Sequence, residues 1–397
     1  MSLNKVVVVG YKRTPMGSFM GSLSKIPAPI IGSKAIEAAI KSISLNPELI
    51  DEVYFGNVLQ AGVGQAPARQ AAIFAGISKH VPCTTINKVC SSGMKSISLA
   101  AQSIALGENN VVVAGGMENM SMSPHYLNLR SGVKFGVSKL NDIMEVDGLI
   151  DPFHNKVMGV YAEATAKKYG ISRSEQDKYC KESYLKSRNA WEKGFFNNEV
   201  CEIKIKDLKG KETNFKKDEE CFNVNFDKIK SLKSPFSNGG TVTAANSSTI
   251  NDGSAALILM SEKKSKELNL KPLAEIISYA DAADDPKWFT TAPSKVLPIA
   301  LNRANLDLSQ IDLFEINEAF SVVTLANMKI LGINSDIVNV NGGAVSLGHP
   351  LGCSGARIVV TLVNALNQRN LKRGAALICN GGGGASAIII ESKNNGH

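Results

Sequence analysis

The chain has 397 residues, more than one hydrophobic core usually serves, so two or more packed units are expected. Its apolar fraction of 44% and charged fraction of 20% are typical of a globular protein and exclude a disordered or fibrous chain. The net charge of +8 is spread along the chain and does not imply a nucleic-acid partner. A mild positive field suits a polyphosphorylated anion, although scattered surface charge explains the balance equally well.

The cysteine and histidine content limits the chemistry. Seven cysteines with no C-x-x-C pair favour free thiols in a reducing compartment. A strand is expected at residues 6–9, which leaves no room for a signal peptide, and no apolar run approaches the ~20 residues that span a membrane. We therefore expect a cytoplasmic protein without a membrane partner, or a mitochondrial one if the chain is a processed form. The 5 histidines include no pair at ligand spacing, so no metal site is expected.

Short β-branched runs alternate with Ala-rich stretches of helical period, which predicts an α/β fold with a buried sheet. The first elements are a strand at 6–9, a helix at 30–43 and a strand at 52–58. Residues 50–57 have a counterpart at 311–318, and about forty residues after each aspartate comes a similar turn into a helix, at 90–93 and 353–356. The sequence therefore predicts an internal duplication, with an N-terminal half at 1–270 and a C-terminal half at 271–397.

The pattern breaks between the two copies, from about residue 121 to about residue 241. Lys-rich, amide-rich and acidic stretches occur there, among them 204–220, with isolated helical segments such as 161–169. This composition predicts an inserted, largely exposed subdomain whose charge runs are solvated faces.

Two cysteines stand at the ends of predicted strands. Cys90 follows the extended run 84–87 and opens a Ser/Gly/Ala-rich helix, where the positive end of the helix dipole favours a thiolate nucleophile. Cys379 ends an apolar strand and meets the glycines 381–384, whose bare amides can hydrogen-bond a developing oxyanion. A buried structural cysteine is the alternative for Cys90. A phosphate loop is the alternative for the glycines, but no Gly-Lys-Ser/Thr follows them.

An imidazole and an amide occupy comparable places. His349 stands in the segment 341–352, predicted to be a loop too Gly-rich for a helix and too irregular for a strand, where it can exchange protons near neutral pH. Asn317 follows the apolar run 313–316, at the point where a buried strand meets a helix. An ordinary loop histidine and a helix cap are the alternatives. The two cysteines, His349 and Asn317 all fall at strand-to-helix turns of the duplicated halves. Their occurrence together predicts a catalytic site.

The segments 87–95, 317–320, 348–350 and 379–383 resemble, in order, the four active-site motifs of the thiolase family. The resemblance covers nearly the whole chain, and segments 240–246 and 341–350 are most similar to eukaryotic acetoacetyl-CoA thiolases. It implies two βαβαβαββ halves in five α/β/α/β/α layers, with the insertion as a loop domain over coenzyme A. It also implies Claisen condensation of two acetyl-CoA to acetoacetyl-CoA and CoA, and the reverse thiolysis.

The resemblance implies a role for each motif residue. Cys90 takes the acyl group, Cys379 is the acid/base, and His349 activates Cys90 and joins Asn317, through a water, in an oxyanion hole. The backbone amides of Cys90 and Gly381 form a second hole. The residues that it implies along the pantetheine tunnel are Leu149, Met158, Ala244, Ser248, Ala319 and Phe320. It implies no cofactor, since coenzyme A is a substrate, leaves potassium activation open, and implies a homotetramer of tight dimers.

Two departures from the family pattern stand out. Close relatives read His-Met-Gly where this chain reads Val157-Met158-Gly159, with His154 displaced upstream, so the loop contact to the thioester is expected to differ. The family arginine against the nucleotide end of coenzyme A has no counterpart in 221–226. Phosphate anchoring then passes to lysines or is weaker; the candidates are Lys228, Lys230 and Lys233.

Three alternative functions stay open. A degradative 3-ketoacyl-CoA thiolase of broader chain length would use the same residues and differ only in pocket size. A decarboxylating condensing enzyme shares the fold, but the pairing of Cys90 with Cys379 favours a thiolase. A non-enzymatic acyl-CoA or lipid carrier would not need two cysteines at equivalent sheet ends.

Overall fold

The computed structural model describes residues 3–206, 210 and 212–393. Ten of its strands form one sheet in the order β14-β15-β16-β13-β1-β12-β5-β3-β4, with β2 (Gly17–Ser18) paired to β12. The N-terminal half supplies β1 (Val6–Arg13), β3 (Glu52–Gly56), β4 (Cys83–Ile86), β5 (Val111–Asn119) and β12 (Asn251–Ser261). The C-terminal half supplies β13 (Ala274–Ala283), β14 (Leu313–Ile316), β15 (Arg373–Asn380) and β16 (Gly384–Ser392). The halves join where β1 pairs antiparallel with β13.

The predicted duplication is confirmed by the topology and by repeated contacts. In each half a short strand lies parallel to a longer one, β3 beside β5 and β14 beside β15. A carboxylate precedes each short strand. Asp51 accepts hydrogen bonds from the backbone N–H groups of Asn110 (2.7 Å) and Val111 (2.9 Å). Asp312 accepts the corresponding bonds from Lys372 (2.9 Å) and Arg373 (2.7 Å).

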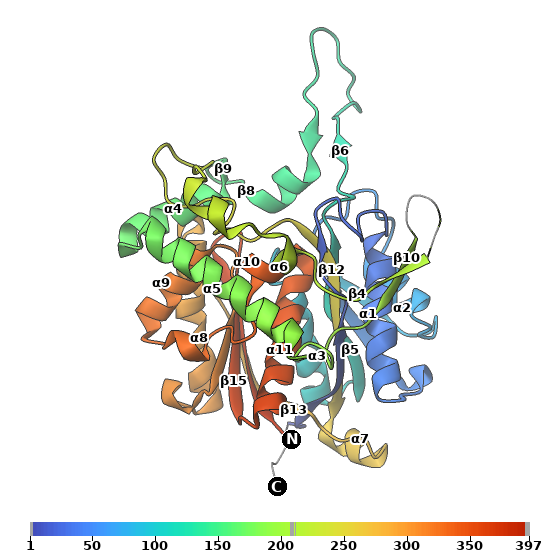
Figure 1. Ribbon diagram of the computed structural model, residues 1–397. Helices are drawn as coiled ribbons and strands as arrows, with labels where there is room; N and C mark the ends of the chain where they lie inside the picture. The colour runs from blue at the N-terminus through green and yellow to red at the C-terminus, as the bar shows by residue number, and fades with distance from the viewer. Residues whose placement is uncertain (1–2, 207–209, 211, 394–397) are drawn as a thin grey trace.

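Six helices and the strands of the two halves form the predicted five layers (Figure 1). The outer helices are α1 (Ala28–Ser42) and α2 (Pro67–Phe74) on the first half, and α8 (Ala292–Ala304) and α9 (Ser321–Leu331) on the second. The central helices are α3 (Ser92–Leu106) and α11 (Leu351–Arg369), which pack with strands of both halves. The first sixteen residues of α11 are all buried, as expected of a helix with sheet on either side.

The two central helices cross closely at their N-terminal turns. A Cβ atom on Gly93 would lie 2.8 Å from the backbone nitrogen of Ala356, and one on Gly355 would lie 2.5 Å from that of Met94. Glycine is therefore required at both positions. The crossing brings the start of α3, which follows Cys90, next to the start of α11, which follows His349.

The insertion lies between β5 and β12. Its hairpins are β6 (His125–Tyr126) with β7 (Asn141–Asp142), β8 (Ile150–Asp151) with β9 (Lys156–Val157), and β10 (Ile203–Lys206) with β11 (Glu212–Phe215). Its helices are the π-helix η2 (Met144–Leu149), α4 (Met158–Tyr169), α5 (Arg173–Glu192), α6 (Glu220–Asn223) and η3 (Phe226–Ser231). The remaining helices of the described chain are η1 (Pro47–Leu49), α7 (Glu262–Glu267), η4 (Pro286–Thr291), η5 (Leu308–Gln310), η6 (Ser335–Ile337) and α10 (Ala344–Leu347).

The expectation that the insertion is largely exposed is wrong for its central part. Helix α5 buries one face, including Tyr179 and Tyr184, against the C-terminal half. Within 204–220, which was expected to be a solvated face, Asp218 is fully buried and binds Arg13 of β1 at 2.7 Å. Glu199 binds the same guanidinium at 2.6 Å. Composition alone could not show this pairing, because the partner lies 205 residues away; residues 207–209 and 211 of the run lie outside the described chain.

Candidate active site

Cys90 lies in a strained turn between β4 and α3. Val89, directly before it, has φ +49°, which is rare for a β-branched residue. Side chains hold this turn: Asn87 Oδ1 accepts from the Val89 N–H (3.0 Å) and Ser92 Oγ from the Lys88 N–H (2.8 Å). Strain that neighbouring contacts maintain is common at functional sites and fixes where the next side chain points.

The thiol of Cys90 is protonated at neutral pH. Burial raises its pKa to about 12, while hydrogen bonds from the amides of Gly381 and of Cys90 itself act in the opposite direction. The prediction of a Cys90 thiolate is therefore wrong, because burial in apolar surroundings raises the pKa more than these amides and the start of α3 lower it. The nucleophile needs a base. The same contacts place the sulfur against the two amides predicted to form an oxyanion hole.

His349 is suited to be that base. It is 6% exposed and lines the same cavity as Cys90. Burial, together with the charge of Arg357, lowers its pKa to about 3, so the imidazole is neutral at neutral pH. Its Nδ1 lies 2.6 Å from Ser354 Oγ, which donates to the carbonyl of Pro350 at 2.8 Å. Both contacts are satisfied when Nδ1 carries the proton and donates to Ser354.

The other imidazole nitrogen then carries a lone pair. Nε2 has no hydrogen-bond partner among the described residues, although it is buried. The chain around it differs from the expected loop, since residues Ala344–Leu347 form the single-turn helix α10. That prediction was wrong because α10 is held by packing against α5, which its own Gly-rich sequence does not reveal. An unpartnered acceptor in a cavity with a protonated thiol is placed to take the thiol's proton as the sulfur attacks a substrate, because pKa values of about 3 and about 12 disfavour a free imidazolium–thiolate pair.

Asn317 and Cys379 are buried at the ends of β14 and β15 and do not line the cavity. The Asn317 side-chain amide lies 3.4 Å from His349 Nδ1, and its Oδ1 has no partner among the described residues. With Nδ1 protonated, the contact is favourable when the amide oxygen faces the ring, which requires only a half-turn of the amide group. The helix-cap alternative is wrong, because α9 begins at Ser321 with Phe320 in the cap position.

Cys379 is 1% exposed, and burial raises its pKa well above that of an ordinary thiol. The neighbouring Cys90 raises it further, so the two thiols interact electrostatically. Past the end of β15, Gly382 (φ +83°) and Gly383 (φ +87°) form the tight turn into β16. The glycine run is therefore a hairpin turn and not a phosphate loop.

A cavity of about 340 Å³ leads to Cys90 between the insertion and the two halves. Of the predicted tunnel residues, those that line it are Leu149, Met158, Ser248, Ala319 and Phe320. Ala244 is exposed and is not part of the lining. Lining residues that the sequence did not single out include Met120, Gly148, Phe236, Ile250, Phe289 and Leu351. They come from six separate segments and carry no shared motif, so only the folded chain could reveal them.

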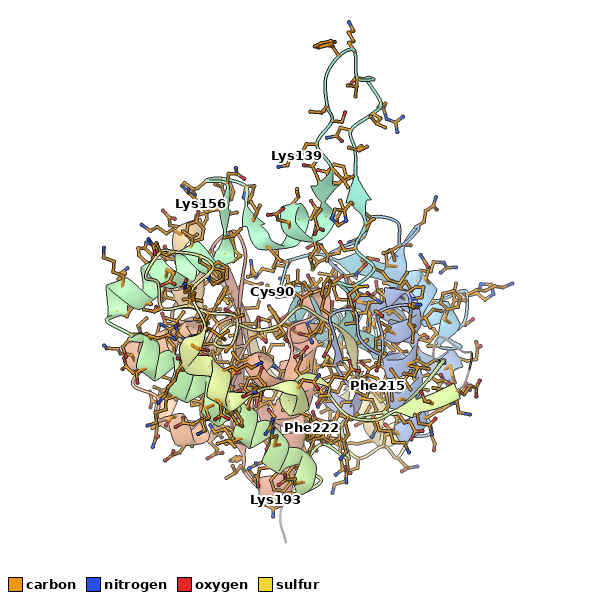
Figure 2. All side chains as sticks on the ribbon, turned by 45° about the horizontal axis from the view of Figure 1, so that its top comes forward. Cys90, Lys139, Lys156, Lys193, Phe215 and Phe222 are labelled. Atoms are coloured by element: carbon orange, nitrogen blue, oxygen red, sulfur yellow. The ribbon has the colours of Figure 1, made fainter. Side chains whose placement is uncertain are left out.

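The structure shows where the residues of the two departures from the family pattern lie relative to the cavity. Val157 lines the cavity, whereas His154 does not and instead lies 3.0 Å from the buried carboxylate of Asp151. Figure 2 shows Cys90 near the middle of the view, with Lys156 of the β8–β9 hairpin and Lys139 of the projecting segment toward the top. The three candidate anchoring lysines are exposed and do not line the cavity; they are Lys228, Lys230 and Lys233.

The described residues contain no group of three or more His, Cys, Asp or Glu placed to bind a metal ion. No helix in the same part of the chain is long and apolar enough to cross a membrane.

A protonated thiol and a neutral imidazole that line one apolar cavity between duplicated α/β halves are the groups of a cysteine-dependent acyltransferase. The family model described as "Thiolase, N-terminal domain" matches residues 6–263, and "Thiolase, C-terminal domain" matches residues 270–392. The chain belongs to the thiolase family.

Similar proteins extend over nearly the whole chain. A probable acetyl-CoA acetyltransferase of Dictyostelium discoideum is 52% identical, with 98% of this chain and 94% of that protein covered. Acetyl-CoA acetyltransferase 2 of Arabidopsis thaliana is 53% identical, with 97% and 96% covered. The crystal structure of the Bacillus anthracis acetyl-CoA acetyltransferase matches at a TM-score of 0.96 and 40% identity, covering 98% of this chain and 99% of that one. A thiolase from Ascaris suum in complex with coenzyme A matches at 0.92 and 45%, covering 98% and 100%.

Proposed function

We propose that this protein is an acetyl-CoA C-acetyltransferase, which condenses two acetyl-CoA to acetoacetyl-CoA and CoA and catalyses the reverse thiolysis. The observation that carries the proposal is the unpartnered Nε2 of a neutral His349 in the cavity that holds the protonated thiol of Cys90. The names of the relatives at 52% and 53% identity support acetyl-CoA as the substrate.

In the first half-reaction His349 Nε2 takes the proton of Cys90 in the same step in which the sulfur attacks the thioester carbonyl of acetyl-CoA. The carbon–sulfur bond to coenzyme A breaks, and Cys379 donates its proton to the leaving thiolate. The product is acetyl-Cys90, with a protonated His349 and a Cys379 thiolate. A thioester suits this route because its thiolate is a good leaving group and its α-carbon is acidic.

In the second half-reaction the Cys379 thiolate removes an α-proton from a second acetyl-CoA. The resulting carbanion attacks the carbonyl of acetyl-Cys90 and forms acetoacetyl-CoA. The Cys90 sulfur leaves and recovers its proton from His349, so every group returns to its starting state. Acetylation replaces the Cys90 thiol by a neutral thioester, so Cys90 can no longer ionise and raise the pKa of Cys379, which favours this order of steps.

Two groups of donors are proposed to stabilise the negative oxygens. The amides of Cys90 and Gly381, which already contact the Cys90 sulfur, would bind the oxyanion formed on acetyl-Cys90. His349 Nε2–H, with a water held by Asn317, would bind the enolate oxygen of the second acetyl-CoA. This assignment uses each side chain in the protonation state that the preceding step leaves.

The apolar cavity is proposed to hold the pantetheine arm of coenzyme A, with its phosphates outside. Lys233, three residues before the lining residue Phe236, is favoured over Lys228 and Lys230 as the phosphate contact. The proposed reaction is balanced without a cofactor, so potassium would act only as an activator. A reducing compartment such as the cytoplasm suits its two essential thiols.

We also propose a homotetramer of dimers. Two features support self-association. Among the described residues, the edge strand β4 pairs with β3 on one side and with no strand on the other. The segment that projects between β6 and β7 (Figure 1) exposes apolar side chains, with Phe135 99% and Leu140 57% exposed.

A chain-length series tests the proposed substrate. Thiolysis rates with 3-ketoacyl-CoA of increasing length should be highest for acetoacetyl-CoA and fall by about tenfold or more once several methylenes are added, because Met120 and Leu351 line the cavity and pack in the cluster against Cys90. Constant rates up to long chains would instead establish the broader degradative thiolase. Absence of both thiolysis and acyl transfer would leave the carrier alternative.

Replacing Cys379 by serine should separate the two half-reactions. The substitution preserves the size of the side chain but raises the pKa of the acid/base by several units, so proton removal from the α-carbon should fail. Single-turnover acetylation of Cys90 should persist while steady-state formation of acetoacetyl-CoA falls by about 10³-fold or more. Cys353→Ser, at the buried start of α11, is the matched control. Equal loss of both activities in the Cys379 variant would refute the separate roles of the thiols.

A further inference from the structure

The catalytic segment from Gly343 to Gly352 is held at both ends by buried carboxylates. Near its start, Glu318 Oε2 accepts a hydrogen bond from the backbone N–H of Val345 at 3.0 Å. At its end, Glu118 Oε2 accepts one from the backbone N–H of Gly352 at 2.8 Å. Both glutamates are 0% exposed, and neither forms an ion pair within the part of the chain that the structure describes.

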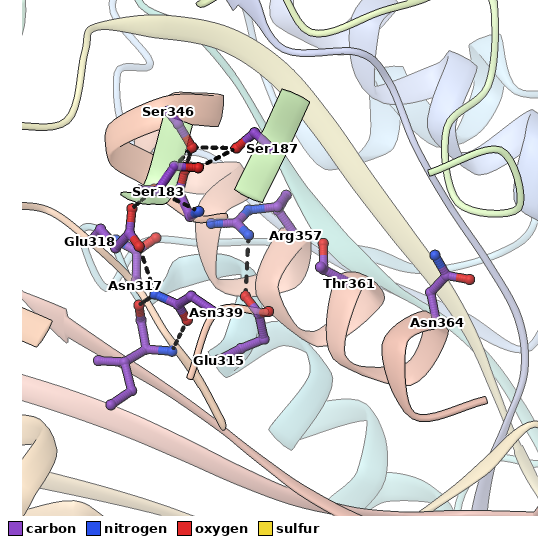
Figure 3. A network of polar contacts seen from close by, with 12 residues as sticks. Ser183, Ser187, Glu315, Asn317, Glu318, Asn339, Ser346, Arg357, Thr361 and Asn364 are labelled. Atoms are coloured by element: carbon purple, nitrogen blue, oxygen red, sulfur yellow. Dashed lines mark hydrogen bonds and ion pairs between the residues drawn. The ribbon is translucent and has the colours of Figure 1, made fainter. Parts of the chain in front are cut away.

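Each carboxylate also binds the element next to the site. Glu318 directly follows Asn317 and accepts from Asn339 (2.9 Å) and from the hydroxyl groups of Tyr179 (2.7 Å) and Ser183 (2.8 Å) on α5. Figure 3 shows Glu318 beside Asn317, Asn339 and Ser183. It therefore joins the amide of the proposed oxyanion hole, the His349 segment and the insertion.

Glu118 makes the corresponding contacts on the N-terminal half. Its carboxylate accepts from the backbone N–H groups of Val58 (3.0 Å) and Leu59 (3.1 Å) and from the Asn57 side chain (2.6 Å). Burial raises its pKa to about 7, and the amides of Leu59, Gly352 and Val58 act in the opposite direction. These donors stabilise the ionised form that the clamp uses and partly offset the larger effect of burial.

Glycines mark both points of contact, independently of the hydrogen bonds. A Cβ atom on Gly343 would overlap the carboxylate of Glu318, and one on Gly352 would lie 2.6 Å from the carbonyl oxygen of Met117 and 2.9 Å from Glu118 Oε2. Between them, Gly348 has φ +106°, and Asn251 Oδ1 accepts from the His349 N–H at 3.0 Å. The glycines of the Gly343–Gly352 segment therefore let these acceptors approach the backbone closely.

We propose that Glu118 and Glu318 are positioning residues, which clamp the Gly343–Gly352 segment so that His349 faces Cys90. A carboxylate can accept from three or four N–H and O–H donors at once, which a neutral side chain cannot. The two clamps, one before and one after His349 in the chain, fix the position of its ring. They also fix the Ser354 contact that selects its tautomer. This inference rests on the proposed acyl transfer at Cys90.

The test uses Glu318→Gln and Glu118→Gln in the full-length protein. Each glutamine keeps the shape of the side chain but turns at least one NH₂ hydrogen toward an N–H donor. We expect kcat for condensation to fall about 10- to 100-fold, because displacement of a catalytic group by 1 Å can cost that much. KM for acetyl-CoA should change less than about threefold, since the cavity lining is untouched.

The matched control is Asp312→Asn, which alters the same kind of contact at the opposite end of β14, where Asp312 accepts from two backbone amides. It should keep the wild-type kcat even if its melting temperature falls. If Glu318→Gln does not fold, Tyr179→Phe removes one donor to the intact carboxylate and should lower kcat about three- to tenfold.

The outcomes separate the two proposals. Failure of the wild-type protein to acquire an acetyl group on Cys90 would overturn the proposed function. An acetylated wild type, with kcat unchanged in Glu118→Gln and in the Glu318→Gln or Tyr179→Phe variant, would overturn the clamp alone. A rise in KM at constant kcat would also overturn it, because it would show a role in binding instead of in positioning His349.

Discussion

Cys90→Ala should abolish acyl transfer and leave the fold intact. The side chain lost is one small thiol, so the free energy of unfolding should fall by only about 1 kcal/mol. Removing a covalent nucleophile, in contrast, costs on the order of 10⁴ to 10⁶ in rate. Mass spectrometry after mixing with acetyl-CoA should show one added acetyl group on Cys90 in the wild-type protein and none in the variant.

The control is Cys353→Ala. Cys353 is the buried counterpart of Cys90 in the second half, at the start of α11, but it does not line the cavity. This variant should be acetylated on Cys90 at the wild-type rate. An acetyl group on Cys379 in the wild-type protein would reverse the roles assigned to the two thiols.

His349→Ala should lower the rates of both Cys90 acetylation and condensation, each by about 10²- to 10³-fold. The first loss is expected because the Cys90 thiol, with a pKa of about 12, stays protonated once its base has been removed. The second follows from loss of the proposed donor to the enolate oxygen. Stopped-flow acetylation and steady-state formation of acetoacetyl-CoA measure the two rates separately.

Two companion measurements sharpen this prediction. Imidazole added to the His349→Ala protein should restore part of the acetylation rate, because the deleted ring lined an open cavity. His154→Ala removes an exposed histidine outside the lining and should keep full activity. If His349→Ala itself retains nearly full activity, His349 is only a loop residue and the base must be sought elsewhere.

The strand and helix pattern could be predicted from the sequence, because buried strands and amphipathic helices follow local periodicity. The run 313–316 coincides with β14, the run 84–87 overlaps β4 except for its last residue, and the segment 161–169 covers most of α4. Helix α10 was missed because tertiary packing, not local preference, stabilises its single turn. The burial of Asp218 was missed for a related reason, since its partner Arg13 is distant in sequence.

The sequence by itself determined the fold family, the duplication and the four motifs that contain Cys90, Asn317, His349 and Cys379. Local residue types determine these features, and four motifs in order are specific enough to identify them. Only the tertiary structure decided how protons are distributed in the site. Burial raises the pKa of Cys90 and lowers that of His349, and these shifts depend on desolvation by residues from both halves. The tunnel lining and the two carboxylates around His349 likewise come from segments that meet only after the chain has folded.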